Sequence, residues 1–374
     1  MGFETNVDLD IAICLYFFHF IQNHKRNKIN SMFIKKIIPI LSLFALINTM
    51  CLLFMENVLY FNYYFIVVVN TMLFFMAIYG YVRFLKMDKK ILFLGCGKMG
   101  SILLANLVEI SKIKPRQIAV IKNNCDKAIF SNEKSWHDDL LIINDSNDLP
   151  SDYCANIIFI CVKPQDAILA TSKLLNRKIT GENTIFISIL AGKTINFLEE
   201  IFKQFVVEPK IVRTMPNLPI QHGKGIFAYK MNKNLQQNDI IYLESIFSGF
   251  GELLLLENED LFNVVTAIFG SGPAYIFLLQ EILVNIATKN GIKEEQAVRL
   301  VNHLFFGSSL MVEKYIADDA KLNLQSLIEL REQVTSKKGT TESAIAILTQ
   351  DNQLNNIFIE AIDSAIARSK SLSS

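Results

Sequence analysis

The sequence lacks an excess of either charge. Its 374 residues include 37 Lys and Arg and 36 Asp and Glu, so the formal net charge is only +1. Proteins that bind nucleic acid need a basic surface, and this balance gives no reason to expect one or any other strongly charged partner. The length allows two domains and an additional segment.

The cysteines also lack the spacing of a metal site or a disulfide framework. They contain no CxxC pair and no histidine at metal-ligand spacing. We therefore expect reduced thiols in a cytosolic protein, without a metal. The six residues are Cys14, Cys51, Cys96, Cys125, Cys154 and Cys161.

Hydrophobic residues, 51% of the chain, are concentrated in residues 1–86. The stretches 37–55 and 60–82 carry no charge, and each is long enough to cross about 30 Å of hydrocarbon as a helix. Basic residues precede the first and follow the second, but none lies between them, which predicts a membrane hairpin with both ends and the following chain in the cytoplasm. No small-residue cleavage site follows, which disfavours a signal peptide. The alternative is a natural start at Met87, with a translated upstream stretch before it.

A strand, a glycine-rich turn and a helix are predicted from residue 90 onward. The apolar run 90–94 leads into GCGKMG and then into an apolar pattern at helical spacing. In this GxGxxG context, the first glycine permits a tight turn, the second lets the backbone approach a pyrophosphate, and the third lets helix and strand pack closely. A turn without function is the alternative to nucleotide binding. The predicted cofactor residues are Gly95, Cys96, Gly97, Lys98, Met99 and Gly100.

The second strand, expected at residues 117–121, lacks an acidic residue at its end. An acid in that region usually binds the ribose 2′-hydroxyl of NAD, but here Lys122, Asn123 and Asn124 follow, and no acid occurs before Asp126. A cation and amides suit a 2′-phosphate, so NADPH is favoured over NADH as the cofactor. The alternative is that Lys122 is an ordinary surface lysine.

Three further strands are expected at residues 156–162, 184–189 and 210–214. Each ends in a loop that contains Gly or Pro, and such loops line the ligand crevice of open α/β sheets. On spacing alone, ordinary strand-ending loops are the simpler interpretation. The residues expected near the nicotinamide half of the cofactor are Lys163, Ala191, Gly192, Pro216 and Asn217. Val162 and Pro164 are further predicted cofactor residues.

After residue 257 the pattern becomes helical. Helices are expected at 261–269, 274–287, 294–316 and 322–332, and from about 342. The turn 335–341 crowds hydroxyls and backbone N–H groups at a helix start, which favours a carboxylate-binding nest. Helix capping by Thr340 or Thr341 is the equally weighted alternative.

Five motifs in this order resemble the pyrroline-5-carboxylate reductase family. They are Gly95-Cys-Gly-Lys-Met-Gly100, Val162-Lys-Pro164, Met215-Pro-Asn217, Gly270-Ser-Gly-Pro-Ala-Tyr275 and Leu330-Arg-Glu-Gln-Val-Thr-Ser-x-x-Gly-Thr-Thr341. The likeness runs from about Asp88 to the C-terminus. The family usually has Pro-Gly where this chain has Lys337-Lys338, and Thr where it has Leu218.

The resemblance implies a Rossmann domain followed by an all-helical domain that forms a dimer, often within larger rings, with active sites shared between subunits. The domains are then expected at 1–86 (the hairpin), 87–256 (NADP-binding) and 257–374 (substrate-binding and dimerisation). The implied reaction is reduction of 1-pyrroline-5-carboxylate to L-proline by NADPH. The substrate carboxylate would bind Ser336, Gly339, Thr340 and Thr341, and the hydroxyl of Thr341, the catalytic candidate, would meet the ring nitrogen.

Two rival functions have to be weighed. A β-hydroxyacid-type dehydrogenase shares the two-domain plan, but it needs a lysine on the first long helix after the sheet, and residues 266–281 contain none. A membrane-tethered NADPH-binding protein with weak or no reductase activity is favoured by Lys337-Lys338 and by the apolar extension.

Overall fold

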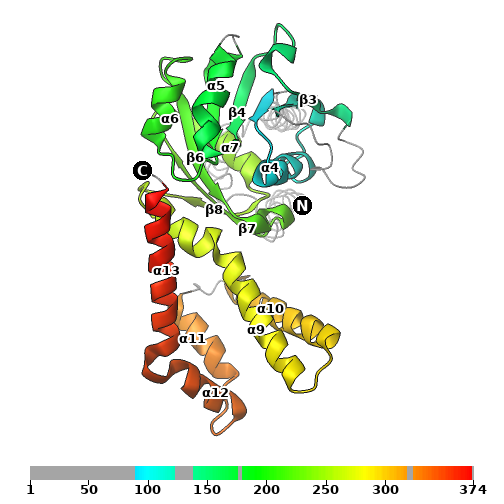
Figure 1. Ribbon diagram of the computed structural model, residues 1–374, viewed down its shortest axis with the longest axis vertical. Helices are drawn as coiled ribbons and strands as arrows, with labels where there is room; N and C mark the ends of the chain where they lie inside the picture. Colours follow the sequence, from blue (N-terminus) through cyan, green and yellow to red (C-terminus); the bar gives the residue numbers. More distant parts are fainter. Residues whose placement is uncertain (1–88, 123–137, 176–178, 318–322, 373–374) are drawn as a thin grey trace, which may run out of the picture. The chain divides into compact units, whose positions relative to one another are not determined.

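The computed structural model describes residues 89–122, 138–175, 179–317 and 323–372 (Figure 1). The hairpin predicted at 37–82 lies outside these residues, as do the predicted cofactor residues Asn123 and Asn124. All three remain predictions. The strands occupy the cyan-to-green part of the chain, and helices α8 to α13 occupy the yellow-to-red part (Figure 1).

The strands form one eight-stranded sheet in the order β3-β2-β1-β4-β5-β6-β7-β8. The strands from β3 to β6 in this order pair in parallel, β7 runs antiparallel to β6, and β8 is parallel to β7. The chain order reverses between β1 and β4, where open α/β sheets bind their ligands. The strands are β1 Ile91–Leu94, β2 Ile118–Ile121, β3 Leu141–Ile143, β4 Ala155–Ile160, β5 Thr180–Ser188, β6 Lys210–Pro216, β7 Gly225–Met231 and β8 Gly251–Leu255.

The central strands are apolar because both of their faces are covered. All four residues of β1 and of β2 are buried, as expected for parallel strands between layers of helices. Across β1 and β4, the rings of Phe93 and Phe159 stack with their centroids 4.6 Å apart. The strands predicted from the sequence are confirmed as β1, β2, β4, β5 and β6. Helices α4 Lys98–Glu109, α5 Ala167–Leu175, α6 Ile195–Phe202 and α7 Gln237–Phe247 complete this part, with 3-10 turns at Pro115–Gln117, Ser146–Asp148, Pro164–Asp166 and Leu218–His222.

The rest of the described chain is helical, which confirms the prediction. Between α9 and α10, Gly291 has a φ of +94°, a left-handed conformation that ends a helix at low cost for glycine. The helices are α8 Leu261–Val265, α9 Gly272–Lys289, α10 Glu294–Ala317, α11 Leu324–Gln333, α12 Thr340–Thr349 and α13 Gln353–Ser371. A π-turn, Thr266–Gly270, joins α8 to α9.

The helical part exposes many large apolar side chains in the single chain. None of the 18 residues of α9 is buried, and the exposed fraction of Phe277 reaches 62%. Leu300, Leu304 and Leu310 of α10 are exposed as well. Apolar surface of this extent is typical of a protein-protein interface.

Candidate functional site

The three glycines of the loop between β1 and α4 differ in their surroundings. Gly95 has a φ of +80°, and a Cβ on it would lie 2.7 Å from Val162 Cγ1. A Cβ on Gly100 would lie 3.1 Å from Cys161 Cβ, whereas one on Gly97 would meet nothing within 4 Å. The first and third glycines therefore permit the turn and the close packing, and the second leaves its backbone open to a ligand, as the sequence predicted.

The start of α4 is suited to an anion. Gly97 is the N-cap, no side chain caps this end, and the first turn carries no acidic residue. Backbone N–H groups and the helix dipole there favour a phosphate. Cys96 is buried, and burial raises the pKa of its thiol to about 12, although the nearby charge of Lys122 lowers it. Only the backbone of Cys96 is therefore placed to contact a ligand.

A cavity of about 220 Å³ opens beside this loop, at the carboxyl ends of β1, β2 and β4. Gly95, Val162 and Lys122, predicted from three separate stretches, all line it. Lys163 is exposed just beyond β4, and Pro164 begins the following 3-10 turn. Residues that were not predicted from the sequence also line the cavity: Asn144, Asp145, Ser146, Asp166 and Lys173. The position of β3 beside β2 would have pointed to the first three.

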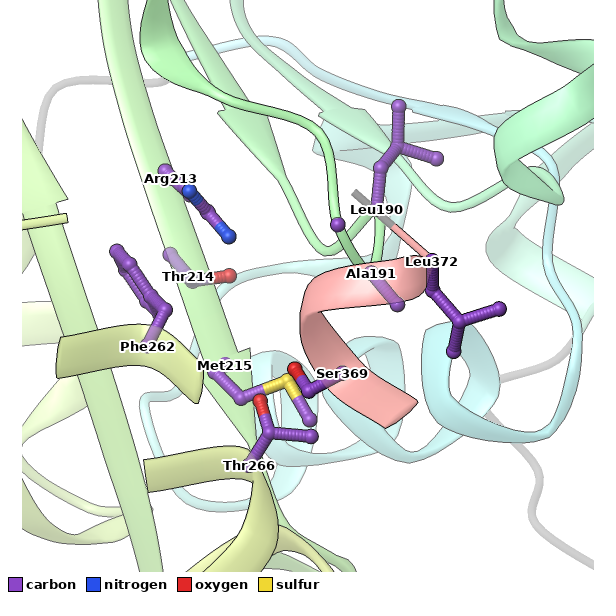
Figure 2. A pocket seen from close by; sticks show the side chains of 10 residues that line it. Leu190, Ala191, Arg213, Thr214, Met215, Phe262, Thr266, Ser369 and Leu372 are labelled. Carbon is purple, nitrogen blue, oxygen red and sulfur yellow. The ribbon is translucent and has the colours of Figure 1, made fainter. Parts of the chain in front are cut away.

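A second cavity, of about 30 Å³, lies at the carboxyl ends of β5 and β6 (Figure 2). Ala191 and Gly192, two of the predicted cofactor residues, line it. Figure 2 shows the side chains of Met215, Thr266 and Ser369 converging on it from β6, from the π-turn and from α13. The wall also includes residues that the sequence did not predict to lie there: Arg213, Phe262, Thr266, Ser369 and Leu372.

A buried cation, Arg213, forms part of the wall of this cavity. Arg213 Nη1 lies 2.7 Å from Glu259 Oε1, and its guanidinium carbon lies 4.2 Å from the centre of the Phe262 ring. The same carboxylate oxygen accepts a hydrogen bond of 3.0 Å from the backbone N–H of Ile195. The start of the helical part is thereby bonded to β6 and to the first residue of α6.

Asn217 was predicted to contact the cofactor, and in the structure its side chain is bonded to the protein. Its Nδ2 donates to the carbonyl of Phe269 at 3.0 Å, and its Oδ1 accepts from the N–H of Ile226 at 2.8 Å. With an exposed fraction of only 7%, the residue joins the end of β6 to the π-turn.

The turn 335–341 holds one non-glycine residue in a strained backbone conformation. Lys338 has a φ of +58°, in the left-handed region that favours glycine. The N-cap of α12 is Gly339, with no side-chain cap, so neither Thr340 nor Thr341 caps this helix. A Cβ on Gly339 would clash with Ser336 Oγ. The turn is largely exposed and lines neither of the two cavities.

Two family models match the chain in succession. Residues 90–192 match the NADP oxidoreductase coenzyme F420-dependent model, and residues 259–372 match the pyrroline-5-carboxylate reductase dimerisation model. The chain belongs to the pyrroline-5-carboxylate reductase family. The second match includes the turn 335–341 and the exposed helices, and it shows that the helical part is a dimerisation domain.

Curated reductases and solved structures agree with this assignment. The chain is 28% identical over 284 residues to the reductase of Staphylococcus haemolyticus, covering 76% of this chain and 98% of that protein. It is 29% identical to the Escherichia coli reductase, covering 77% and 99%. The structure of the Plasmodium falciparum pyrroline carboxylate reductase with NADP bound gives a TM-score of 0.61 at 29% identity, covering 76% and 98%. That of the Coxiella burnetii reductase gives 0.63 at 29%, covering 77% and 99%.

Within the described residues, one helical stretch, Leu261–Lys289, is long and apolar enough to cross a membrane. It lies inside the segment that matches the dimerisation model. A dimer interface accounts for its exposed apolar residues, so this stretch does not support a membrane location.

Proposed function

We propose that this chain is a pyrroline-5-carboxylate reductase, which uses NADPH to reduce 1-pyrroline-5-carboxylate to L-proline. The observation that carries the proposal is the match to whole reductases, of which the chain covers 98–99% at 28–29% identity. The loop geometry at Gly95, Gly97 and Gly100 supports it independently, because each of the three glycines has the surroundings that dinucleotide binding requires.

The residues of the first cavity fit the cofactor. The open backbone at Gly97 and the uncapped start of α4 would hold the pyrophosphate, and Lys122 at the cavity wall would face the 2′-phosphate. Lys98, Met99, Val162, Lys163 and Pro164 complete the proposed contacts. Ala191 and Gly192 border the second cavity, which we assign to the nicotinamide half. NADPH, when bound, supplies the hydride that reduces the C=N carbon.

The protein's own task is to orient the imine and to supply hydrogen bonds. Orientation of two reactants accounts for much of the rate in such a reaction. Ser336, Gly339 and Thr340 would bind the substrate carboxylate through hydroxyls and backbone N–H groups. The hydroxyl of Thr341 would hydrogen-bond the ring nitrogen, and solvent would supply the proton. Because the turn lines neither cavity of its own chain, we propose that it completes the site of the partner subunit.

Turnover tests the function directly. Purified full-length protein and a version starting at Met87 are mixed with 1-pyrroline-5-carboxylate and NADPH, and the loss of NADPH absorbance is followed together with the L-proline formed. We expect proline in equal amount to the NADPH consumed. NADPH binding without turnover would favour the alternative, a membrane-tethered NADPH-binding protein. The observation that favours this alternative is the positive φ of Lys338, because it strains the turn that we assign to the substrate.

Thr341→Ala tests the site. Loss of one hydrogen bond to a charged or developing charged group should reduce kcat/KM for the imine about ten- to a hundredfold. The dissociation constant for NADPH should not change, because the proposed phosphate site lies at Gly95–Gly100. Thr335→Ala in the same turn is the control, since that hydroxyl donates to the carbonyl of Arg331. Equal kinetics in both variants would contradict the role of Thr341.

We further propose that residues 37–82 form the membrane hairpin and hold the catalytic region at the cytoplasmic face. The support is the uncharged length of the two stretches and the basic residues that flank them. Fractionation of cells that express the chain with and without residues 1–86 tests this. We expect only the longer protein to stay with membranes after a carbonate wash, and recovery of both in the soluble fraction would refute the hairpin.

A further inference from the structure

The π-turn Thr266–Gly270 has a cause in the sequence. In an α-helix the carbonyl of Phe269 would accept from the N–H of residue 273, but that residue is Pro273, which has no N–H. The N–H of Ser271 in turn reaches back to the carbonyl of Thr266 at 2.9 Å, five residues away. It therefore leaves the carbonyl of Ala267 without its usual helical donor.

Two side chains donate hydrogen bonds to these two carbonyls. Asn217 Nδ2 donates to the carbonyl of Phe269 at 3.0 Å, and Tyr275 Oη donates to the carbonyl of Ala267 at 3.0 Å. Buried carbonyls without a donor are costly, so both bonds stabilise this backbone geometry. Gly270 adds close packing, because a Cβ there would lie 3.1 Å from Met215 Cε. The end of β6 with Asn217 and the segment Gly270–Tyr275 thus pack and bond together at the π-turn.

The π-turn forms part of the second cavity. Thr266, its first residue, lines that cavity beside Met215, and Figure 2 shows the two side chains next to each other. A change in the turn would therefore move one wall of the space that we assign to the reacting rings. Unusual helical turns of this kind frequently occur at functional sites.

We propose that Asn217 is a positioning residue, which holds the π-turn and thereby fixes Thr266 and Met215 around the second cavity. This inference rests on the proposed function. It assigns Asn217 to the orientation of the imine through the π-turn, in place of the direct cofactor contact expected from the sequence. Both bonding atoms of its side chain already have protein partners.

Asn217→Asp tests the inference most selectively. Aspartate keeps an oxygen for the N–H of Ile226 but replaces the donor to Phe269 with a second oxygen. Asn232→Asp is the matched control at the other end of β6. There Asn232 Oδ1 accepts from the N–H of Ile211 at 3.1 Å, and Nδ2 donates to the carbonyl of Pro209 and to Glu199 Oε1, each at 2.8 Å. Both changes remove an amide donor to a backbone carbonyl, but only the first lies at the π-turn. Asn232→Asp also places a carboxylate beside Glu199, so it should disturb the fold at least as much.

Three measurements are made on the full chain: the KM and kcat for the imine, the dissociation constant for NADPH, and hydrogen exchange of residues 266–272. For Asn217→Asp we expect a higher imine KM, a kcat/KM lower by about ten- to a hundredfold, faster exchange in 266–272 and unchanged NADPH affinity. Asn232→Asp should leave all three unchanged even if it lowers the melting temperature.

Several outcomes would overturn the proposal. They are unchanged imine kinetics and exchange in Asn217→Asp, a parallel loss of NADPH affinity, or the same kinetic loss in Asn232→Asp. If Asn217→Asp does not fold, Tyr275→Phe, which removes the bond to Ala267, must speed exchange in 266–272. If the parent protein fails to reduce the imine, the proposed function fails, but the exchange measurement still decides whether Asn217 holds the turn.

Discussion

Arg213 and Glu259 form a short ion pair, with 2.7 Å between Nη1 and Oε1, and only 8% of the Arg213 side chain is exposed. Removing one member of such a pair leaves an uncompensated charge out of water, which costs more than the pair itself contributes. Glu259→Gln should therefore lower the free energy of unfolding by about 3 kcal/mol. Urea unfolding at fixed protein concentration measures this.

The double variant Arg213→Met with Glu259→Gln distinguishes charge from packing. When Arg213 has been replaced, Glu259→Gln no longer leaves an unpaired buried charge. The double variant should therefore lose less stability than the sum of the losses in the two single variants. If the losses in free energy of unfolding were strictly additive, the two charges would make no net contribution to stability by attracting each other.

Lys122 should determine the choice between the two nicotinamide cofactors. Lys122→Ala should weaken the binding of NADPH by about tenfold, because a charge-assisted contact to the 2′-phosphate is lost. The binding of NADH should be weakened much less. Lys233→Ala, which removes an exposed lysine outside both cavities, is the control for net charge. Equal kinetic constants for NADPH and NADH in the parent protein would refute the predicted preference.

Lys338 adopts a φ of +58°, which costs a non-glycine residue about 1 kcal/mol. Lys338→Gly removes both the strain and the charge, whereas Lys338→Ala removes only the charge. We expect Lys338→Gly alone to raise the free energy of unfolding, by about 1 kcal/mol. If both variants instead raise the imine KM and flatten its salt dependence, the lysine acts by attracting the carboxylate.

The dimerisation helices should make folding depend on association. Phe277→Glu places a charge on the exposed apolar face of α9 and should shift the protein to monomers or unfold it. Val207→Glu is the control, because Val207 is more exposed still but lies outside the helical part. Sedimentation velocity at micromolar concentration measures the outcome. A folded, active monomer of the Phe277→Glu variant would contradict the interface.

The nucleotide-binding half could be predicted from the sequence because its signals are local. The strand β1, the three glycines and the start of α4 lie within about one supersecondary unit, where periodicity and glycine chemistry decide the structure. The positive φ at Lys338 could also be anticipated, since the family that the sequence resembles usually has glycine at this position. In contrast, β3, β7 and β8 were not predicted, because their places in the sheet depend on pairing with β2, β6 and β7, respectively, and not on their own pattern.

The second cavity could not be predicted, since its wall is assembled from distant parts of the chain. Asn217 and its partner Phe269 are 52 residues apart, and no local pattern reports such a bond. Pro273 was the one available signal, because a proline there leaves the carbonyl of Phe269 without a helical donor. The roles of Ser336 to Thr341, the domain boundaries and the hairpin remain predictions.

Ser369 and Leu372, at the very end of the described chain, line the same cavity as Leu190 and Arg213. During synthesis the nucleotide-binding sheet can form while the helices are still being made, but this cavity cannot close until the last turn of α13 has left the ribosome. Its shape therefore depends on Ser369 and Leu372, which are among the last of the described residues to be synthesised.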